Sequence, residues 1–594
     1  MSTRPNYRGL RRKLVVAFDI GTTFSGASFA VLDPGLPPLA VIEGVTSFPG
    51  QLNTRGDSKI PSIICYDEYR EVCAAGSEAT DEAFLDLAED RGLTTIEWFK
   101  LHLRPKHLPS SHVNDSDIPT LPLNKTPIDV FADFLRYTHT CATDYIKNNR
   151  GPQFWSTVED DIDYVLTHPN GWEGLQQSQM RQAAIQAGLI NVHDPESRLQ
   201  FVTEGEASLH YCISKGAMNE AKMHDRGVII VDAGGGTIDL SAYAKTASGG
   251  FEEMVPAQCR LQGSVYVTRR AEVYLRDRLK GSRYGNDQDI THITSVFDKS
   301  TKHLFRDDSS ISYIRFGSAR DKDPEVDIKG GQMKISGEVM KKFFAPCIDE
   351  IVEAISEQQK QSHIPIVSIL LVGGFAASDW LFSNLEKALA DMGLTLSRPD
   401  GFVNKAVAEG AVSFYLDHCV TTRVSRFNYG VRFKVRFNSA DPEHQKRAFA
   451  TYVQPDGQTY ISGLFDVILP KGSRVEEETE FRQGYSRQSF ERESLENMRT
   501  EILCYRGKSK EARIWRDSEP NMFSTLCTIE ADLRSSRCIR TRRSPFGQSY
   551  YYANYEIVLL FGLTELKAQI CWKEGQEKRS SAIVVYDHVH TERR

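Results

Sequence analysis

LVVAFDIGTTFSGASFAVL, residues 14–32, is typical of a β-strand, a Gly-Thr turn and a second strand. The first run is rich in β-branched residues and the second alternates small and large residues, a pattern that favours a hairpin over a helix. VIIVDAGGGTIDLSAYA, residues 228–244, repeats this design. When Asp19 is aligned with Asp232, the apolar residues of the two leading strands coincide and Gly21 falls on Gly234. The repetition predicts an internally duplicated fold with two similar halves.

The pattern of elements divides the chain into two regions. Up to about residue 415, strand patterns alternate with helical periodicity, most clearly at 173–188 and 378–393, which indicates an α/β class. After about residue 425, short strands are separated by turn residues and no long helical pattern follows, which predicts a β-sandwich. Residues 418–426 are the predicted linker, and the acidic run at 476–480 is predicted to be a solvated loop.

Composition excludes several classes of partner. Hydrophobic residues make up 40% of the 594 residues and charged residues 25%, and the net charge of −7 offers no bulk attraction to nucleic acid or to an anionic membrane. No run approaches the roughly 18–20 apolar residues that a membrane-spanning helix needs. The eleven cysteines are scattered without a CxxC pair, which predicts reduced thiols. We expect a cytoplasmic protein, with the nucleus as the alternative, and partners other than nucleic acid.

The two turns have the chemistry that a metal-bound triphosphate requires. A glycine-containing turn lets backbone N–H groups approach phosphate oxygens, and one or two carboxylates suffice for Mg²⁺, which keeps several of its waters. Asp19 and Asp232 each end a strand and are followed by such a turn, and a third glycine pair stands at Gly373 and Gly374 before a helical pattern. No GxxxxGK[ST] or GxGxxG motif occurs, so we do not expect the phosphates to be bound by a glycine-rich loop between a strand and a helix.

These hairpins and the VGG turn at 372–374 resemble those of the actin-like ATPase superfamily. Within it, DAGGGTIDLS at 232–241 is similar to the seventy-kilodalton heat-shock chaperone family rather than to the sugar kinases. Further segments resemble this family along most of the chain: IPSIICY at 60–66, TTIEWFKLHL at 94–103, VTEGEAS at 202–208 and AVAEGA at 406–411. The C-terminal third resembles the family's peptide-binding domain less specifically. The fold that this resemblance implies is a duplicated, two-lobed, actin-like α/β ATPase domain, related to the ribonuclease H fold, followed by an all-β sandwich.

The resemblance implies a role for each matching residue. Asp19, Asp232 and Glu204 would hold Mg²⁺, largely through its waters, and Lys100 and Asp239 would orient the attacking water and stabilise developing charge. The residues implied in nucleotide binding are Gly21, Thr22, Thr23, Gly234, Gly235, Gly236, Thr237, Lys302, Gly373 and Gly374.

The sequence also departs from the family. The adenine pocket of the family uses a Lys-Arg-x-x-Ser helix face, and in the nearest stretch here, KSTKHLF at 299–305, only Lys302 matches. The linker lacks the acidic, leucine-rich stretch of the family, and the chain ends at VVYDHVHTERR with no helical lid, a pattern that resembles the divergent, lidless branch. The expected domains are a disordered basic tail at 1–12, the ATPase domain at 13–420 and the β-sandwich at 421–594.

The resemblance implies a Mg-dependent ATPase that converts ATP to ADP and phosphate. Its nucleotide state would modulate binding of unfolded or specific protein clients by the β domain, with co-chaperones as further partners. Because the linker and the lid depart from the family, a nucleotide-dependent binding or scaffold protein without folding activity is the alternative. A small-molecule kinase is a third hypothesis, for which the sequence shows no catalytic base beside a substrate hydroxyl.

Overall fold

The computed structural model describes residues 6–36, 41–51, 58–105, 118–172, 174–218, 225–399, 405–476, 479–562, 565–580 and 583–584. The chain divides into two compact units, the first formed by Met1–Trp172 and Gln179–Val420, the second by Glu173–Ser178 and Thr421–Arg594. Within the expected tail, residues 6–12 lie against the end of the first hairpin: the Tyr7 N–H donates to the Leu36 carbonyl at 2.9 Å, and Arg12 pairs with Asp33 at 2.6 Å.

The first half of the first unit is built on the predicted hairpin. β1 (Lys13–Ile20) and β2 (Phe24–Leu32) pair antiparallel, with Asp19 opposite Gly26. The spatial order of the sheet is β3 (Glu43–Gly44), β2, β1, β8 (Ile162–His168) and β9 (Leu199–Thr203), and β4 (Lys59–Pro61) also pairs with β2. β8 runs parallel to β1, and β9 runs parallel to β8. A hairpin followed by two parallel strands is therefore the plan of this half.

The second half repeats that plan. β10 (Gly227–Ala233) and β11 (Ile238–Lys245) form the second predicted hairpin, with Asp232 opposite Asp239. β18 (Ile366–Val372) lies parallel to β10, and β19 (Thr395–Ser397) lies parallel to β18. On the other side, β11 pairs with β12 (Phe251–Glu253) and β13 (Gln258–Arg260). The matching strand order and directions are the duplication that the repeated sequence predicts.

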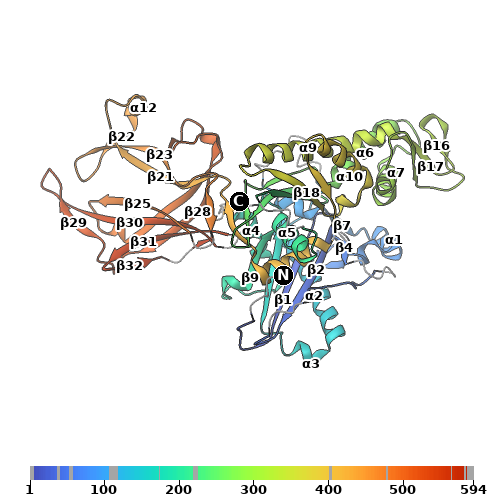
Figure 1. Ribbon diagram of the computed structural model, residues 1–594, viewed down its shortest axis with the longest axis horizontal. Helices are drawn as coiled ribbons and strands as arrows, with labels where there is room; N and C mark the ends of the chain where they lie inside the picture. The colour runs from blue at the N-terminus through green and yellow to red at the C-terminus, as the bar shows by residue number, and fades with distance from the viewer. Residues whose placement is uncertain are drawn as a thin grey trace. The chain divides into compact units, whose positions relative to one another are not determined.

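Each half has its own hydrophobic core of β-strand and helix side chains. The main helices are α2 (Pro127–Arg150), α4 (Gly174–Ala187), α5 (Glu204–Ser214), α6 (Ser264–Arg278), α9 (Gly337–Gln361), α10 (Asp379–Ala390) and α11 (Ala406–Asp417) (Figure 1). α4 confirms the helix predicted at 173–188. α10 confirms the second one but ends three residues before Gly393, which has a left-handed φ of 73°. Among the described residues no helix combines the length and apolar character that crossing a bilayer requires.

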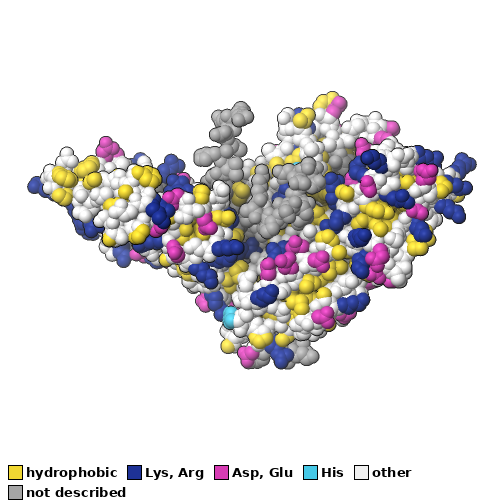
Figure 2. All heavy atoms as spheres, turned by 90° about the horizontal axis from the view of Figure 1, so that it is seen from above, with side chains coloured by type: hydrophobic (Ala, Val, Ile, Leu, Met, Phe, Trp, Pro, Cys, Tyr) yellow, Lys and Arg dark blue, Asp and Glu magenta, His cyan; other side chains and the backbone are white. Residues whose placement is uncertain are grey.

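Each half also carries a small additional sheet. In the first half these strands are β5 (Ile63–Tyr66), β6 (Val72–Ala75) and β7 (Thr94–Glu97), accompanied by helix α1 (Glu82–Arg91). In the second half they are β14 (Ile311–Arg315), β15 (Lys322–Asp323), β16 (Ile328–Lys329) and β17 (Gln332–Ser336), accompanied by helix α7 (Asp287–Val296). On the face shown in Figure 2, acidic and basic side chains of the first unit are interspersed, as expected for a modest net charge.

Most of the described strands of the second unit lie in two antiparallel sheets. One has the order β22 (Thr451–Val453), β23 (Thr459–Leu469), β21 (Asn428–Arg436), β26 (Asn497–Tyr505) and β28 (Phe523–Asp532), and β27 (Arg513–Trp515) also pairs with β23. The other has the order β25 (Glu480–Ser489), β30 (Ser549–Gly562), β31 (Glu565–Glu574) and β32 (Gln576–Arg579), with β29 (Arg540–Arg543) beside β30. Side chains of both sheets, such as Ile502 and Ile557, share one hydrophobic core.

Two expectations for this region differ from the structure. The predicted linker contains strand β20 (Val420–Val424), which pairs with β24 (Arg474–Glu476). The predicted solvated acidic loop is interrupted by strands, because Glu476 ends β24 and Glu480 begins β25; Glu477 and Glu478 lie outside the described residues. Glu480 bonds to Arg482 and Arg579, and these ion pairs keep an acidic residue in the strand.

Helices α5 and α11 cross at close quarters inside the first unit. A Cβ added at Gly410 of α11 would lie 1.8 Å from the Ala207 carbonyl oxygen of α5. We therefore expect Gly410→Ala to destabilise the first unit by about 1–3 kcal/mol through overpacking. Gly44→Ala is the matched control, since its Cβ would meet only the Ser28 hydroxyl at 3.9 Å. Equal urea-unfolding midpoints of the two variants would contradict this packing.

Candidate functional site

A cavity of about 430 Å³ lies inside the first unit, at the carboxyl ends of the parallel strands of both halves. Ligands of α/β folds commonly bind at this edge of the sheet. The cavity is lined by Asp19, Gly21, Thr22, Thr23, Phe24, Lys59, Lys100, Glu204, Asp232, Gly234, Gly235, Gly236, Thr237, Gly373, Gly374, Ala377 and Val407. The two hairpin turns and the third glycine turn thus open onto one space.

The two hairpin turns touch each other. A Cβ added at Gly235 would lie 2.2 Å from the Thr23 hydroxyl oxygen, and one added at Gly236 would lie 2.4 Å from the Thr22 hydroxyl oxygen. Only glycine lets the second turn approach so closely. Among the described residues, no acceptor receives a hydrogen bond from the main-chain N–H of these four residues. Facing turns with free N–H donors suit an anion with several oxygens.

The third turn is held against the second hairpin by a glycine in the left-handed region. Gly373 follows β18 with a φ of 91°, and a Cβ there would lie 2.3 Å from Oδ1 of Asp232. The main chain therefore passes directly beside this carboxylate, which a larger residue would displace.

Asp19 is held at the end of β1 by two donors. Nζ of Lys59, on β4, lies 2.8 Å from Oδ2 of Asp19, and the Thr167 hydroxyl at the end of β8 donates to Oδ1 at 3.0 Å. The carboxylate is only 3% exposed. Because both of its oxygens are fixed, its orientation toward the cavity is fixed before any ligand binds.

Helix α5 links the two halves through one of its faces. Glu204, its first residue, follows the parallel strand β9, and Oε1 of Glu204 accepts from Nζ of Lys100 at 2.6 Å. One turn further on, the Ser208 hydroxyl donates to Oδ2 of Asp232 at 2.8 Å. Residues i and i+4 share a helix face, so the same surface of α5 contacts Lys100 from the first half and Asp232 from the second. The helix N-terminus also favours the carboxylate of Glu204.

Asp239 lies opposite Asp232 in the β10–β11 ladder, completely buried. Its Oδ1 accepts from the main-chain N–H of Asn170 at 2.6 Å. Among the described residues no donor of good geometry reaches Oδ2, which is buried. A buried carboxylate oxygen without a donor is costly, and a cation or an ordered water would relieve it.

Burial and the neighbouring charges shift the pKa values of these carboxyl groups. Burial, followed by the charge of Glu204, raises the pKa of Asp232 to about 7. Burial also raises the pKa values of Glu204 and Asp239, and the neighbouring acids add to the effect. For Asp19, burial is outweighed by the charges of Lys59 and Lys100, so its pKa is lowered. The two lysines do not balance the four acids.

The residues present fit a hydrated divalent cation. Carboxylate oxygens are hard ligands suited to Mg²⁺, and the unpaired Oδ2 of Asp239 shows that acceptor capacity is in excess. Asp19, Glu204 and Asp232 are the carboxylates that line the cavity and would hold the cation, largely through its waters.

The structure brings the predicted residues together with two exceptions. Asp239 does not line the cavity and lies beside Asp232, on the neighbouring strand β11. Lys302 does not line it either: its ammonium group binds Asp298 and, at 3.2 Å, the Thr268 hydroxyl. All other predicted residues lie in the lining. Sequence reasoning missed Lys59, although it directly precedes the IPSIICY segment, and it missed Thr167 and Ser208, for which no local motif gave a signal.

Comparison with known proteins defines the class to which the chain is related. No protein-family model matches it. Among curated proteins, it is similar to heat shock 70 kDa protein 12A of Homo sapiens, with 25% identity over 552 residues, covering 78% of this chain and 77% of the relative. The corresponding protein of Mus musculus is 24% identical over the same shares. Heat shock 70 kDa protein 12B of Homo sapiens is 23% identical over 585 residues, covering 82% and 80%.

The chain is thus similar, over about four fifths of its length, to proteins named as 70 kDa heat-shock proteins, in agreement with the resemblance of its sequence motifs. Its mixed α/β architecture, with two halves of matching topology, is consistent with the two-lobed, actin-like fold of that family.

The raised pKa of Asp232 predicts a pH dependence of stability. The folded protein holds this proton up to about pH 7, whereas the unfolded chain releases it near the ordinary value of 3.8, so the stabilisation is lost as the pH rises between these values. Without divalent cations, the free energy of unfolding of the wild type relative to Asp232→Asn should fall by up to about 1.4 kcal/mol per pH unit between about pH 5 and about pH 7. Urea unfolding measures this difference, and a difference that stays constant would contradict the assignment.

Proposed function

We propose that the protein binds ATP and ADP with Mg²⁺ in the cavity of the first unit and hydrolyses ATP to ADP and phosphate. The observation that carries the proposal is the pair of touching turns, Thr22–Thr23 and Gly235–Gly236, with their free N–H groups beside buried carboxylates. The relatedness to the 70 kDa heat-shock proteins supports the same interpretation.

Different residues of the cavity would bind the phosphates and the nucleoside. The turns position the phosphate oxygens, aided by the hydroxyls of Thr22, Thr23 and Thr237, and Gly373 and Gly374 allow the main chain to approach the nucleoside. When bound, Mg²⁺ neutralises charge on the phosphate oxygens. In phosphoryl transfer the protein contributes mainly by positioning the reactants and by stabilising the developing charge.

Lys100 has the placement of a group that acts on the reacting oxygens. It is 3% exposed and lines the cavity, and its Nζ is held by Glu204 and lies 5.5 Å from the centre of the Trp172 ring. Held in this way, the ammonium group would stabilise developing negative charge and orient a water for attack. Asp239, beside Asp232 on β11, would act through a second water or through the hydration shell of the cation.

In this proposal the second unit is a β-sandwich that binds protein clients, and the nucleotide state of the first unit modulates that binding. Such modulation is limited by how differently the two nucleotide states hold the client. Chaperone action and nucleotide-dependent binding without folding are two forms of this activity. Stimulation of ATP turnover by an unfolded polypeptide favours the chaperone, and unchanged turnover with ATP bound favours the binding protein.

The test of hydrolysis uses Lys100→Met in the full chain. We expect phosphate release to fall by about 10²–10⁴-fold, since an electrostatic and proton-orienting group is lost, while a fluorescent ADP analogue still binds. The control is Lys334→Met, an exposed lysine of β17 outside the cavity, which should keep wild-type turnover. Unchanged turnover in Lys100→Met would remove this lysine from the mechanism. Phosphate transferred to a sugar rather than to water would identify a kinase.

A further inference from the structure

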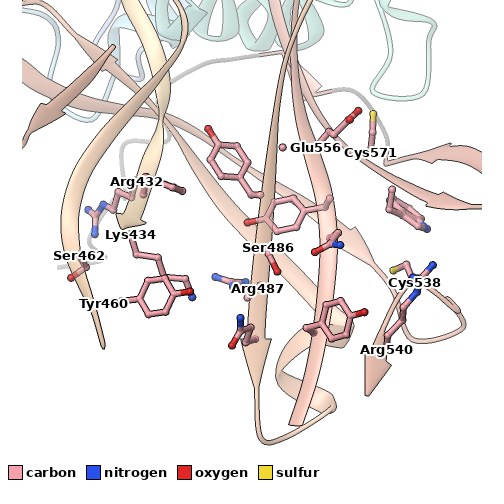
Figure 3. Close-up of a pocket in the computed structure, with 18 of the residues that line it drawn as sticks. Arg432, Lys434, Tyr460, Ser462, Ser486, Arg487, Cys538, Arg540, Glu556 and Cys571 are labelled. Carbon is pink, nitrogen blue, oxygen red and sulfur yellow. The ribbon is translucent and has the colours of Figure 1, made fainter. Parts of the chain in front are cut away.

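The second unit contains a larger cavity, of about 1170 Å³, between β21 and β23 on one side and β25 and β30 on the other. Figure 3 shows Lys434 and Tyr460 on one wall, with Arg487 reaching toward them from β25 on the other. Four further tyrosines and Trp572 also line it. The lining is therefore aromatic and polar rather than aliphatic.

The charge of this lining is strongly positive. Its basic residues are Arg432, Lys434, Arg487, Arg516, Arg540 and Lys573, and its acidic residues are Glu556 and Glu577. Both acids pair with Arg482, which lies outside the lining, at 3.2 Å from Glu556 and 2.8 Å from Glu577, and Glu577 also pairs with Arg579 at 2.6 Å. The two acids thus pair with arginines outside the lining, and the six basic residues of the lining outnumber them.

Most of the basic groups lack a counter-ion. Among the described residues, none of Lys434, Arg487, Arg516, Arg540 and Lys573 forms an ion pair; Arg432 alone does so, with Glu501 at 3.4 Å. Lys434 donates instead to the neutral side chain of Gln454 at 2.7 Å. Burial, and then the charge of Arg487, lower its pKa. Nε of Arg516 is buried with no acceptor among the described residues.

A second cavity, of about 690 Å³, borders the first. The two share the lining residues Arg432, Tyr485, Arg487 and Tyr555, so Arg487 contributes to both.

Unpaired strand edges border the same space. β25 is the terminal strand of its sheet, and among the described strands it pairs only with β30. β21 pairs with β26 only from Asn428 to Val431, so the following residues, Arg432 to Arg436, pair on one side only, with β23. An open edge offers a row of main-chain donors and acceptors to an extended chain, which is how peptides add to a sheet.

We propose that this cavity binds an extended, acidic protein segment, whose carboxylates meet Lys434, Arg487 and Arg516 while its main chain pairs with the open edge of β25. This inference deepens the protein-binding half of the proposed function and rests on it. The basic groups without an ion pair favour a ligand with acidic side chains. The open strand edges favour a ligand with an extended polypeptide backbone. A single-stranded nucleic acid would suit the charges and the aromatic rings but has no backbone to pair with a strand edge.

The test measures binding to the nucleotide-free full chain by fluorescence anisotropy. The probe is a labelled ten-residue peptide, the length of β25, that alternates Glu and Thr. Matched peptides replace Glu by Gln, Lys or Leu, and a uridine oligonucleotide of the same length is the nucleic-acid arm. We expect the Glu peptide to bind at least about tenfold more tightly than the Gln, Lys and Leu peptides, and its affinity to fall as NaCl rises from about 50 to about 300 mM.

Variants locate the binding site. Arg487→Gln and Lys434→Gln should each weaken binding of the Glu peptide by about three- to tenfold. Arg534→Gln, an exposed arginine paired with Asp532 outside both cavities, is the control and should bind as the wild type does. Unchanged melting temperatures show that the variants fold, and the salt dependence of the wild type provides a test that needs no variant.

Each other outcome overturns the inference in a distinct way. Preferred binding of the Leu peptide would refute the acidic occupant but keep a client-binding function, whereas binding of none of the peptides would also remove peptide binding from the proposed function. Tighter binding of the oligonucleotide, lost in Arg487→Gln, would replace the peptide by nucleic acid. ATP hydrolysis is measured separately through Lys100 and is not affected by any of these results.

Discussion

The first unit depends on an imbalance of buried charge. Four carboxyl groups, two of them directly opposite each other in one hairpin, share the charges of Lys59 and Lys100. Burying like charges is unfavourable unless something compensates them, so the protein either holds protons in the cluster or binds a cation there. Burial raises the pKa values of Asp232 and Asp239, and Oδ2 of Asp239 has no donor among the described residues. The glycine turns that follow Asp19 and Asp232 place main-chain N–H groups without an acceptor among the described residues beside these carboxylates.

Helix α5 connects the charged cluster to both halves of the first unit. It begins directly after the last strand of the first half and contacts Lys100 and Asp232 through residues one turn apart. It also crosses α11, where Gly410 permits main-chain contact. A change in the charge state of the cluster therefore acts on a helix shared by both halves, and small displacements there must be accommodated by closely packed backbone.

The hairpins, the duplication and most site residues could be predicted because they are local: an aspartate, a glycine turn and a β-branched run are adjacent in sequence. Lys59, Thr167 and Ser208 could not, since each reaches the site from a segment with no motif of its own, and only tertiary packing places it. Lys302 matched a family pattern by type alone, and its ammonium group is bound by Asp298 instead. The sequence of β25 gives a weak strand signal, because FRQGYSRQS alternates poorly between polar and apolar residues; ion pairs and pairing with β30 hold it in the sheet. The roles of the site residues and the boundaries of the domains remain predictions.

The open edge of β25 has a consequence for the behaviour of the protein at high concentration. An unpaired edge can accept the same strand of a second molecule as readily as it accepts a partner segment, and such edge-to-edge pairing leads to self-association. Glu480, Arg482 and Arg487 place charges along this strand, and an arginine beside an arginine disfavours the homotypic pair. Solubility and ligand choice are thus governed by the same side chains: residues that attract an acidic partner also repel a copy of the strand that carries them.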